Sequence, residues 1–426
     1  PENERAVAKF LRENGLDVSV SSELLPEFRE YERASTVSIN AYTSPVLKRH
    51  IDALLEDQRI KRLRIMLSNG GSLPAREAKG SSVHTILSGP AAGVIAARKL
   101  ARLAGHDKFI SLDIGGTSTD ACLCAGDIPF STTHSIDALP VAVPAIEIHT
   151  VGAGGGSIAH LDAGGALRVG PQSAGSRPGP ACYGRGGRAT LTDANLLLGR
   201  LPERGLLGGR MSLNVEAARG ALDSLSLQSG MSQEELADGI VEVADANIER
   251  AVRLISVERG HDPAEFVLVA FGGAGGQHAA SIMRKLGLAA VLVPPDPGVF
   301  SACGLLWSDS IRDYSRTVFQ PTQGLRGGYF FYLFDPLKRK AESELALSGV
   351  RKADAAFIMS ADMRYVGQSY ELNVRMRGGI EEAFHQAHER EYGYCDRDRP
   401  IEIVTVRLRV IVRNKQEPVP ARSGAT

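Results

Sequence analysis

Apolar residues recur at helical spacing in several parts of the chain. Leu47–Leu55 and the alanine-rich run Ala91–Leu103 place apolar side chains every three or four residues. The same spacing extends through residues 212–260, at Leu236, Ile240, Ala244, Ile248, Val252 and Ile255. This periodicity gathers apolar side chains on one face and therefore predicts amphipathic helices in all three parts.

Short apolar runs that end in glycines predict strands followed by tight turns. FISLDIGG, from Phe109, ends in an aspartate and two glycines. FVLVAF, residues 266–271, runs into GGAGGQ before helical spacing resumes from His278 to Leu286. A strand, a glycine turn and a helix in succession form the unit of α/β folds. We therefore expect an α/β fold.

The last hundred residues predict a region of a different kind. Helices are expected at 336–347 and 381–392, and strands at 355–365, 370–375 and 401–412. This mixture of helices and strands predicts a C-terminal α+β region.

Charge and composition narrow the class of protein. The 426 residues are 43% hydrophobic and 23% charged, which is typical of a folded chain of two or three domains. Lys+Arg 49 balance Asp+Glu 49, which argues against binding to nucleic acid or to a membrane surface. The apolar runs are also too short to span a bilayer. Five cysteines without a CxxC pair favour a cytoplasmic protein.

The segment LDIGGTSTD, residues 112–120, is the sharpest candidate for chemistry. Two glycines let backbone amides approach a phosphate, the hydroxyls add donors, and an aspartate can hold hydrated magnesium. The candidates are Asp113 as catalytic residue and metal ligand, and Gly115, Gly116, Thr117 and Thr119 as cofactor-binding residues. The alternative is a hairpin turn with a polar tip. The segment lacks the lysine of G-x-x-x-x-G-K-[ST], which excludes a P-loop.

A second candidate is the turn FGGAGG, where a nucleotide could lie before a helix N-terminus. Its glycines are Gly272, Gly273, Gly275 and Gly276. The spacing is not G-x-G-x-x-G, so a dinucleotide fold is disfavoured. The alternative is close packing between a strand and a helix.

The segment HTVGAGGGSIAHLD supplies further candidates. His149 suits acid–base catalysis, and Gly154 and Gly155 suit cofactor binding. His160 could act in the same way, although a histidine held by a backbone carbonyl is the alternative for both. Downstream, Arg177 and Arg185 could clamp a carboxylate or phosphate, or could simply be solvated.

These motifs resemble a known family. LDIGGTSTD, GAGGGSIAHLD, SAGSRPGPACYGRGG, LTDANLLLGRL and AFGGAGGQHA, with NAYTSPVL, MLSNGG and LSGPAAG upstream, are similar to the hydantoinase A/oxoprolinase family of ATP-dependent cyclic-amide hydrolases. The resemblance implies an actin-like ATPase fold of the sugar kinase and Hsp70 type, with ATP and Mg²⁺ as cofactors. It also implies that residues 113–119 form the second phosphate turn and residues 272–276 the adenosine turn.

The resemblance implies an activity and partners as well. The expected reaction is ring opening of hydantoin, N-methylhydantoin or 5-oxoproline after phosphorylation of the amide oxygen. The alternatives are a subunit of an ATP-dependent ketone carboxylase, and an Hsp70-like or actin-like ATP-binding module without a small substrate. A hydantoinase B-like subunit or domain is the expected partner, in an oligomer.

The chain also departs from the family pattern. Family members open with their own GGTFTD turn, and that motif has no second copy here. We therefore expect a fragment that lacks most of the first lobe and is shortened at its C-terminal side. The expected organisation is a remnant of the N-terminal lobe in residues 1–80, an ATPase core in 81–312 and an α+β region in 313–426.

Overall fold

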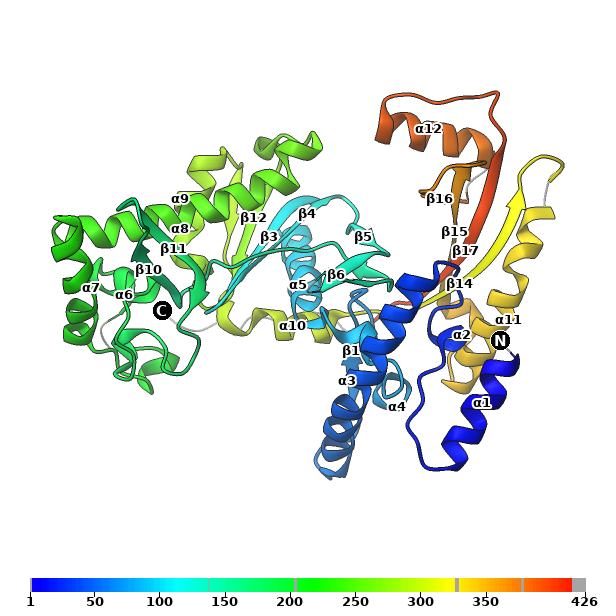
Figure 1. Cartoon of the computed structure of the whole chain (residues 1–426), viewed down its shortest axis with the longest axis horizontal. Coiled ribbons are helices and arrows are strands. Elements are labelled where there is room, and N and C mark those ends of the chain that lie inside the picture. Colours follow the sequence, from blue (N-terminus) through cyan, green and yellow to red (C-terminus); the bar gives the residue numbers. More distant parts are fainter. Residues whose placement is uncertain (1, 137, 203–204, 326–328, 377–378, 416–426) are drawn as a thin grey trace. The chain divides into compact units, whose positions relative to one another are not determined.

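The computed structural model describes residues 2–136, 138–202, 205–325, 329–376 and 379–415. Contacts divide the chain into two compact units (Figure 1). Unit 1 comprises residues 1–88, 130–145 and 308–426, and unit 2 comprises residues 89–129 and 146–307. The expected regions 1–80 and 313–426 therefore belong to one unit, together with a segment taken from the expected core. Among the described residues, no helix has the length and apolar character needed to cross a membrane.

Unit 2 is built on a five-stranded sheet in the order β13-β12-β3-β4-β9. The strands are β3 (Lys108–Ile114), β4 (Thr119–Ala125), β9 (His149–Val151), β12 (Val267–Phe271) and β13 (Ala290–Leu292). β12 pairs in parallel with β3 and β13, whereas β3, β4 and β9 pair antiparallel. This mixed sheet with helices on it confirms the expected α/β class.

Side chains alternate between the two faces of this sheet. Ile110, Leu112 and Leu268 share a core with α8 (Gln233–Ile255) and α9 (Gly275–Leu286). The opposite face carries Phe271, which contacts α10 (Phe300–Trp307) through Phe300. A Cβ on Gly93 of α5 (Ser88–Leu103) would also collide with Phe271, so α5 packs closely on that face.

A second core of unit 2 lies around the first half of α8. The hairpin of β10 (Ser157–Leu161) and β11 (Leu167–Ser173) contributes to this core together with α6 (Leu191–Leu197) and α7 (Val215–Ser229). The sequence predicted helix throughout residues 212–260, but the structure has two helices. Gly230 ends α7 in the left-handed conformation, and the Ser232–Glu235 capping box starts α8.

Unit 1 is built on an antiparallel sheet in the order β14-β17-β15-β16. These strands are β14 (Ser310–Pro321), β15 (Ala355–Tyr365), β16 (Leu372–Arg375) and β17 (Ile401–Val412), and α11 (Asp335–Leu347) and α12 (Ile380–Tyr392) share its apolar core. The expected boundary after residue 312 falls inside β14, and charged residues interrupt the apolar pattern of that strand.

The remaining elements of unit 1 come mostly from the first part of the chain. They are α1 (Glu2–Glu13), α2 (Ser21–Leu24), α3 (Glu30–Glu56), α4 (Ala75–Ala78), and the hairpins β1 (Arg64–Met66) with β2 (Ser72–Pro74) and β6 (His134–Ile136) with β7 (Leu139–Val141). The short strands β5 (Phe130–Ser131) and β8 (Ala145–Ile146) pair at the edge of the inserted segment.

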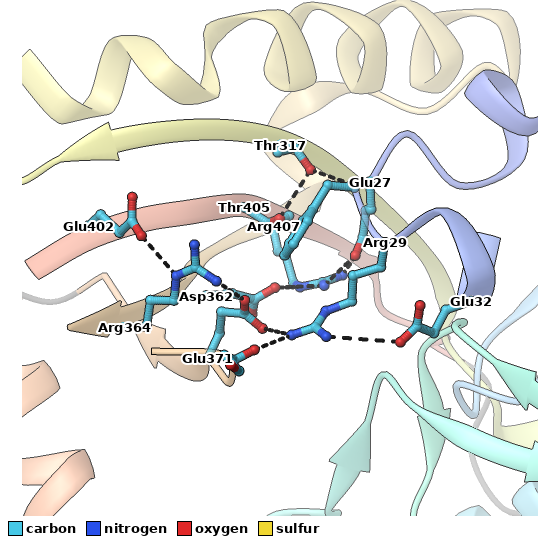
Figure 2. Close-up of polar contacts among 12 residues, drawn as sticks. Glu27, Arg29, Glu32, Thr317, Asp362, Arg364, Glu371, Glu402, Thr405 and Arg407 are labelled. Atoms are coloured by element: carbon cyan, nitrogen blue, oxygen red, sulfur yellow. Dashed lines mark hydrogen bonds and ion pairs between the residues drawn. The ribbon is translucent and has the colours of Figure 1, made fainter. Parts of the chain in front are cut away.

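The polar face of the unit 1 sheet holds a dense ion-pair network (Figure 2). Arg407 lies on the face opposite the apolar Val406 and Leu408, and it donates to Glu27 at 2.7 and 2.8 Å and to Asp362 at 2.6 Å. The network comprises Arg29, Arg364 and Arg407 with Glu27, Glu32, Asp362, Glu371 and Glu402. It fastens the segment before α3 to the sheet.

Candidate functional site

The first candidate turn is the tip of the β3–β4 hairpin. Ile114 pairs with Thr119, and the Gly115 amide donates to the Ser118 carbonyl at 3.0 Å. Gly116 and Thr117 are exposed. The backbone amides of Gly116 and Thr117 have no hydrogen-bond acceptor among the described residues. The segment is therefore a hairpin turn, and its two free backbone amides are available to bind an anion.

The second glycine segment lies beside this tip. Gly272 follows β12 with φ +84°, and a Cβ there would collide with the Asp113 carboxylate and the Ile114 carbonyl. The Ala274 amide donates to the Ile114 carbonyl at 2.9 Å. α9 begins at Gly275, three residues before the start that the sequence predicted. Gly273, Gly275 and Gly276 thus surround a helix N-terminus, whose first amides face outward from the helix.

Asp113 stands between these two segments. It pairs with Phe271 of β12 and with Asp120 of β4, and Ser301 of α10 donates to its carboxylate at 3.2 Å. Burial raises the pKa of Asp113, the charge of Asp120 raises it further, and the Ser301 hydroxyl partly opposes both. Burial likewise raises the pKa of Asp120, against a hydrogen bond from Thr150.

This pair of carboxylates fits a magnesium ion. Directly opposed residues on antiparallel strands point to the same face, so Asp113 and Asp120 place two acidic groups side by side. Their raised pKa values mean that negative charge is costly here, and a cation would relieve that cost. Mg²⁺ in nucleotide sites commonly takes one or two carboxylates with phosphate oxygens and water.

The GAGGGS segment supports the hairpin tip from behind. The amides of Gly155 and Gly156 donate to the carbonyls of Gly115 and Gly116 at 2.9 and 2.7 Å. A Cβ on Gly154 would lie 2.8 Å from backbone atoms of Thr117, closer than real Cβ atoms approach. Glycine is therefore required at position 154 for packing against the tip, whereas a Cβ on Gly155 would meet the Thr192 hydroxyl at 2.8 Å. Cofactor binding by Gly154 and Gly155 stays a prediction.

Thr119 also belongs to this support. It is fully buried, and its hydroxyl donates to the Ala153 carbonyl at 2.5 Å. The hydroxyl is thus engaged within the protein, so any effect of Thr119 on a nucleotide would act through the position of the GAGGGS segment.

A loop and the start of α6 form the next layer. Thr192 donates through its hydroxyl to the Gly155 carbonyl at 2.7 Å. The buried Asp193 accepts from the amides of Thr190, Ala181 and Cys182, which fixes the loop that carries Arg177 and Arg185. Both arginines are exposed on this loop. His160, on β10, is half-buried.

His149 lies away from Asp113. It pairs with Ala121, which belongs to the core beneath α8, so its side chain points to the face opposite Asp113. There it lines a cavity of about 290 Å³ with Glu147 and Arg259, which form an ion pair at 2.6 Å. The structure does not bring the two expected catalytic residues together. A catalytic role for His149 stays a prediction, and such a role would belong to this cavity.

Three residues of the site were not predicted from the sequence. Asp120 was inside the quoted motif, and a four-residue hairpin tip would have placed it opposite Asp113. Ser301 comes from a helix 188 residues further along the chain, and no local pattern signals that approach. Thr192 was part of LTDANLLLGRL, yet its contact with Gly155 depends on the tertiary fold.

Comparisons with known proteins agree on one family. The chain matches the model of Hydantoinase/oxoprolinase over residues 33–314. It is 36% identical to caprolactamase subunit alpha from Pseudomonas jessenii, over 99% of this chain and 63% of that subunit. It is 33% identical to 5-oxoprolinase from Saccharomyces cerevisiae, over 96% of this chain and 33% of the relative. The chain therefore spans less than two thirds of each of these relatives.

Solved structures show the same relationship. The crystal structure of ATP-dependent caprolactamase from Pseudomonas jessenii superimposes with a TM-score of 0.83 at 33% identity, over 100% of this chain and 65% of that one. The nucleotide-free structure of acetone carboxylase gives a TM-score of 0.76 at 25% identity, over 99% and 63%. The resemblance that the motifs suggested is confirmed. Because the family model matches residues 33–314 and these relatives are similar over nearly the whole chain, the chain belongs to the hydantoinase/oxoprolinase family.

Proposed function

We propose that this chain is the nucleotide-binding part of an ATP-dependent hydrolase of cyclic amides. The observation that carries the proposal is the juxtaposition of two glycine segments, 115–118 and 272–276, at one end of one sheet with Asp113 between them. Free backbone amides at both segments suit phosphate groups, and the carboxylate suits a metal. The α/β fold of the actin-like ATPase type, which family membership implies, uses such turns for ATP.

In this proposal the chain's own residues bind and orient the cofactors. Amides of Gly116 and Thr117 would hold phosphate oxygens, Gly273–Gly276 would border the adenosine, and Asp113 with Asp120 would hold Mg²⁺. ATP supplies the phosphoryl group that activates the amide oxygen of the substrate. Phosphoryl transfer depends on positioning and on neutralising charge, so rigid donors and a fixed metal are the main requirements of the site.

The names of the relatives support the substrate class. Caprolactamase and 5-oxoprolinase are both named for cyclic amides. Hydantoin, N-methylhydantoin, 5-oxoproline and caprolactam are therefore the substrates to test. The caprolactamase relative is a subunit, which supports a second, hydantoinase B-like subunit as partner in an oligomer.

A ketone carboxylase subunit is the second candidate. The likeness to acetone carboxylase, which carries out ATP-dependent acetone carboxylation, favours it. The nucleotide site would be the same in both cases, and the carbonyl-containing substrate would differ.

The test uses the full-length protein with its partner subunit. ADP release is measured with each cyclic amide, and with acetone plus bicarbonate. Release stimulated by a cyclic amide, with the ring-opened product, supports the hydrolase, whereas stimulation by acetone alone selects the carboxylase. Absence of nucleotide binding would refute both.

An Asp113→Asn variant locates the activity. It should lower turnover by about 100-fold or more, because the metal loses a charged ligand. Asp107→Asn is the matched control, since Asp107 lies just before the opposite end of β3 in an exposed ion pair with Arg102. Equal turnover in the two variants would remove Asp113 from the mechanism.

A further inference from the structure

Three buried polar side chains form a chain through the interior of unit 2. His278 is fully buried, and its Nδ1 lies 2.6 Å from Oδ1 of Asp245. Its Nε2 lies 3.3 Å from Nδ2 of Asn195. Asp245 and Asn195 are 2% and 1% exposed, so water does not compete for these contacts. A hydrogen bond in such an interior is electrostatically stronger than the same bond in water.

The direction of the hydrogen bonds follows from the acceptors. A carboxylate only accepts, so Nδ1 of His278 donates to Asp245. Nε2 is then left to accept from the amide nitrogen of Asn195. Oδ1 of Asn195 has no partner among the described residues, although it is buried. Among the described residues, the side chain of Asn195 is therefore held through its nitrogen, by the bond to His278.

Each of the three residues comes from a different helix. Asn195 is on α6, one turn after Thr192, whose hydroxyl holds Gly155. His278 is on α9, one turn after Gly275. Asp245 is on α8, between the half of that helix that packs on α6 and α7 and the half that packs on the sheet.

The three helices thereby connect the two glycine segments of the site. From the hairpin tip the path runs through Gly155, Thr192 and Asn195 to His278, and then back through the first turn of α9 to the segment 272–276. The segments are also joined directly, by the bond from Ala274 to Ile114 and by the pairing of β12 with β3 that ends at Phe271 and Asp113. The polar chain adds a further connection between them, through the helices α6, α8 and α9.

We infer that Asn195 and His278, held by Asp245, are positioning residues that set the GAGGGS support and the 272–276 segment relative to each other. Neither side chain lies at the hairpin tip, so neither is expected to touch a nucleotide. The consequence for nucleotide affinity rests on the proposed function, but the coupling between the two segments does not. The coupling can therefore be tested without nucleotide.

The test is amide hydrogen exchange in the full-length protein without nucleotide, with Asn195→Leu and His278→Leu variants. We expect His278→Leu to raise exchange about tenfold or more in residues 153–157, although the change is on α9. Asn195→Leu should do the same in residues 272–277, although the change is on α6. Amides of α7, which carries no member of the polar chain, serve as the reference for any loss of global stability.

Ile282→Val is the matched control. Ile282 is fully buried on α9 and packs in the sheet core, so its shortening perturbs the same helix without touching the polar chain. It should leave exchange in residues 153–157 within about twofold of the parent. If each leucine variant raises exchange only in its own helix, or no more across the connection than Ile282→Val does, the inference is wrong.

Affinity for Mg-ADP, measured on the same proteins, separates this inference from the proposed function. Weakening of about tenfold in both leucine variants, with less than twofold in the control, supports a positioning role. If the parent protein binds no nucleotide, the proposed function fails while the exchange data still decide the coupling. Unchanged affinity despite faster exchange would overturn the positioning role in binding.

Discussion

Replacing Arg407 by alanine should strongly destabilise unit 1. The Arg407 side chain is 15% exposed, and its partners Glu27 and Asp362 are 14% and 13% exposed (Figure 2). Alanine would leave two largely buried carboxylates without their cation. Removing one partner of a buried ion pair costs about 3–5 kcal/mol, because the remaining charge stays desolvated. We therefore expect a loss of about 3–5 kcal/mol in the free energy of unfolding.

The pKa of Arg407 indicates that this loss does not depend on pH near neutrality. Burial by itself lowers the pKa of the guanidinium, but Glu27 and Asp362 outweigh burial and raise the pKa overall. A raised folded-state pKa contributes stability that is fully present below the unfolded-state pKa and is lost only at higher pH. Because an arginine pKa is already far above neutral, the contribution is complete throughout the neutral range.

Arg397→Ala is the control for this prediction. Arg397 also bonds to one glutamate through two nitrogens, at 2.5 and 3.1 Å to Glu382, but its side chain is 60% exposed. An exposed ion pair contributes less than about 1 kcal/mol. The assay is urea denaturation followed by amide exchange in β15 and β17, since two units need not unfold in one transition.

The comparison of Arg407→Ala with Arg397→Ala tests whether burial of the ion-pair network makes Arg407 important for stability. A cost for Arg407→Ala no greater than that for Arg397→Ala would show that water reaches the network. A triple variant that also carries Glu27→Gln and Asp362→Asn removes the orphaned charges. It should recover a large part of the loss, and no recovery would show that the arginine acts by packing instead.

Three further changes have expected outcomes. Asp113→Asn should raise the melting temperature of the nucleotide-free protein near pH 7. Burial and the charge of Asp120 raise the pKa of Asp113, so the charged carboxylate lowers the stability of the folded protein at pH values above the ordinary pKa of an aspartate. A lower melting temperature would contradict this. Gly154→Ala should lower the free energy of unfolding by about 1–3 kcal/mol and weaken Mg-ADP binding, because the added Cβ would displace the hairpin tip. Gly187→Ala should have neither effect, because a Cβ at that position meets no atom within 4 Å. The Ser22 side chain, together with the Ser21 side chain and the amides of both residues at the start of α2, lowers the pKa of Glu4 from 4.5 to about 2. Protection of α2 from exchange should therefore be lost as pH falls from about 4.5 towards 2, and Glu4→Gln should abolish this dependence.

Regular elements with an uninterrupted pattern were predictable from the sequence. The strands expected at 355–365 and 401–412 have the bounds of β15 and β17, and the helix expected at 336–347 is α11. β14 was missed. Its Arg312 is buried against Glu77, and its Asp313 bonds to Arg409, so the strand carries charges where a pattern analysis expects apolar residues. Their partners are distant in sequence, and local periodicity cannot supply them.

The site was predictable as a set of turns and less so as a geometry. Strands that end in glycines indicated both segments, and the aspartate before Gly115 indicated the charge. The opposed Asp120 required the register of the hairpin, and Ser301 required the tertiary fold. The glycines of GAGGGS were expected to face a ligand, but glycine is needed equally where two backbones pack together. Composition does not distinguish these two uses of glycine.

The alternation of side chains along strands explains how the site is divided. Asp113 and Ala121 lie on adjacent antiparallel strands, one residue out of register, so they point to opposite faces of the sheet. His149 is paired with Ala121 and shares its face, beneath α8, while Asp113 shares its face with α10. Side chains on opposite faces of one sheet are separated by the backbone layer, so a molecule bound on one face contacts the side chains of that face. The chemistry proposed for the glycine segments therefore depends on Asp113, Asp120 and the free amides, and the cavity beside His149 is a separate feature of unit 2.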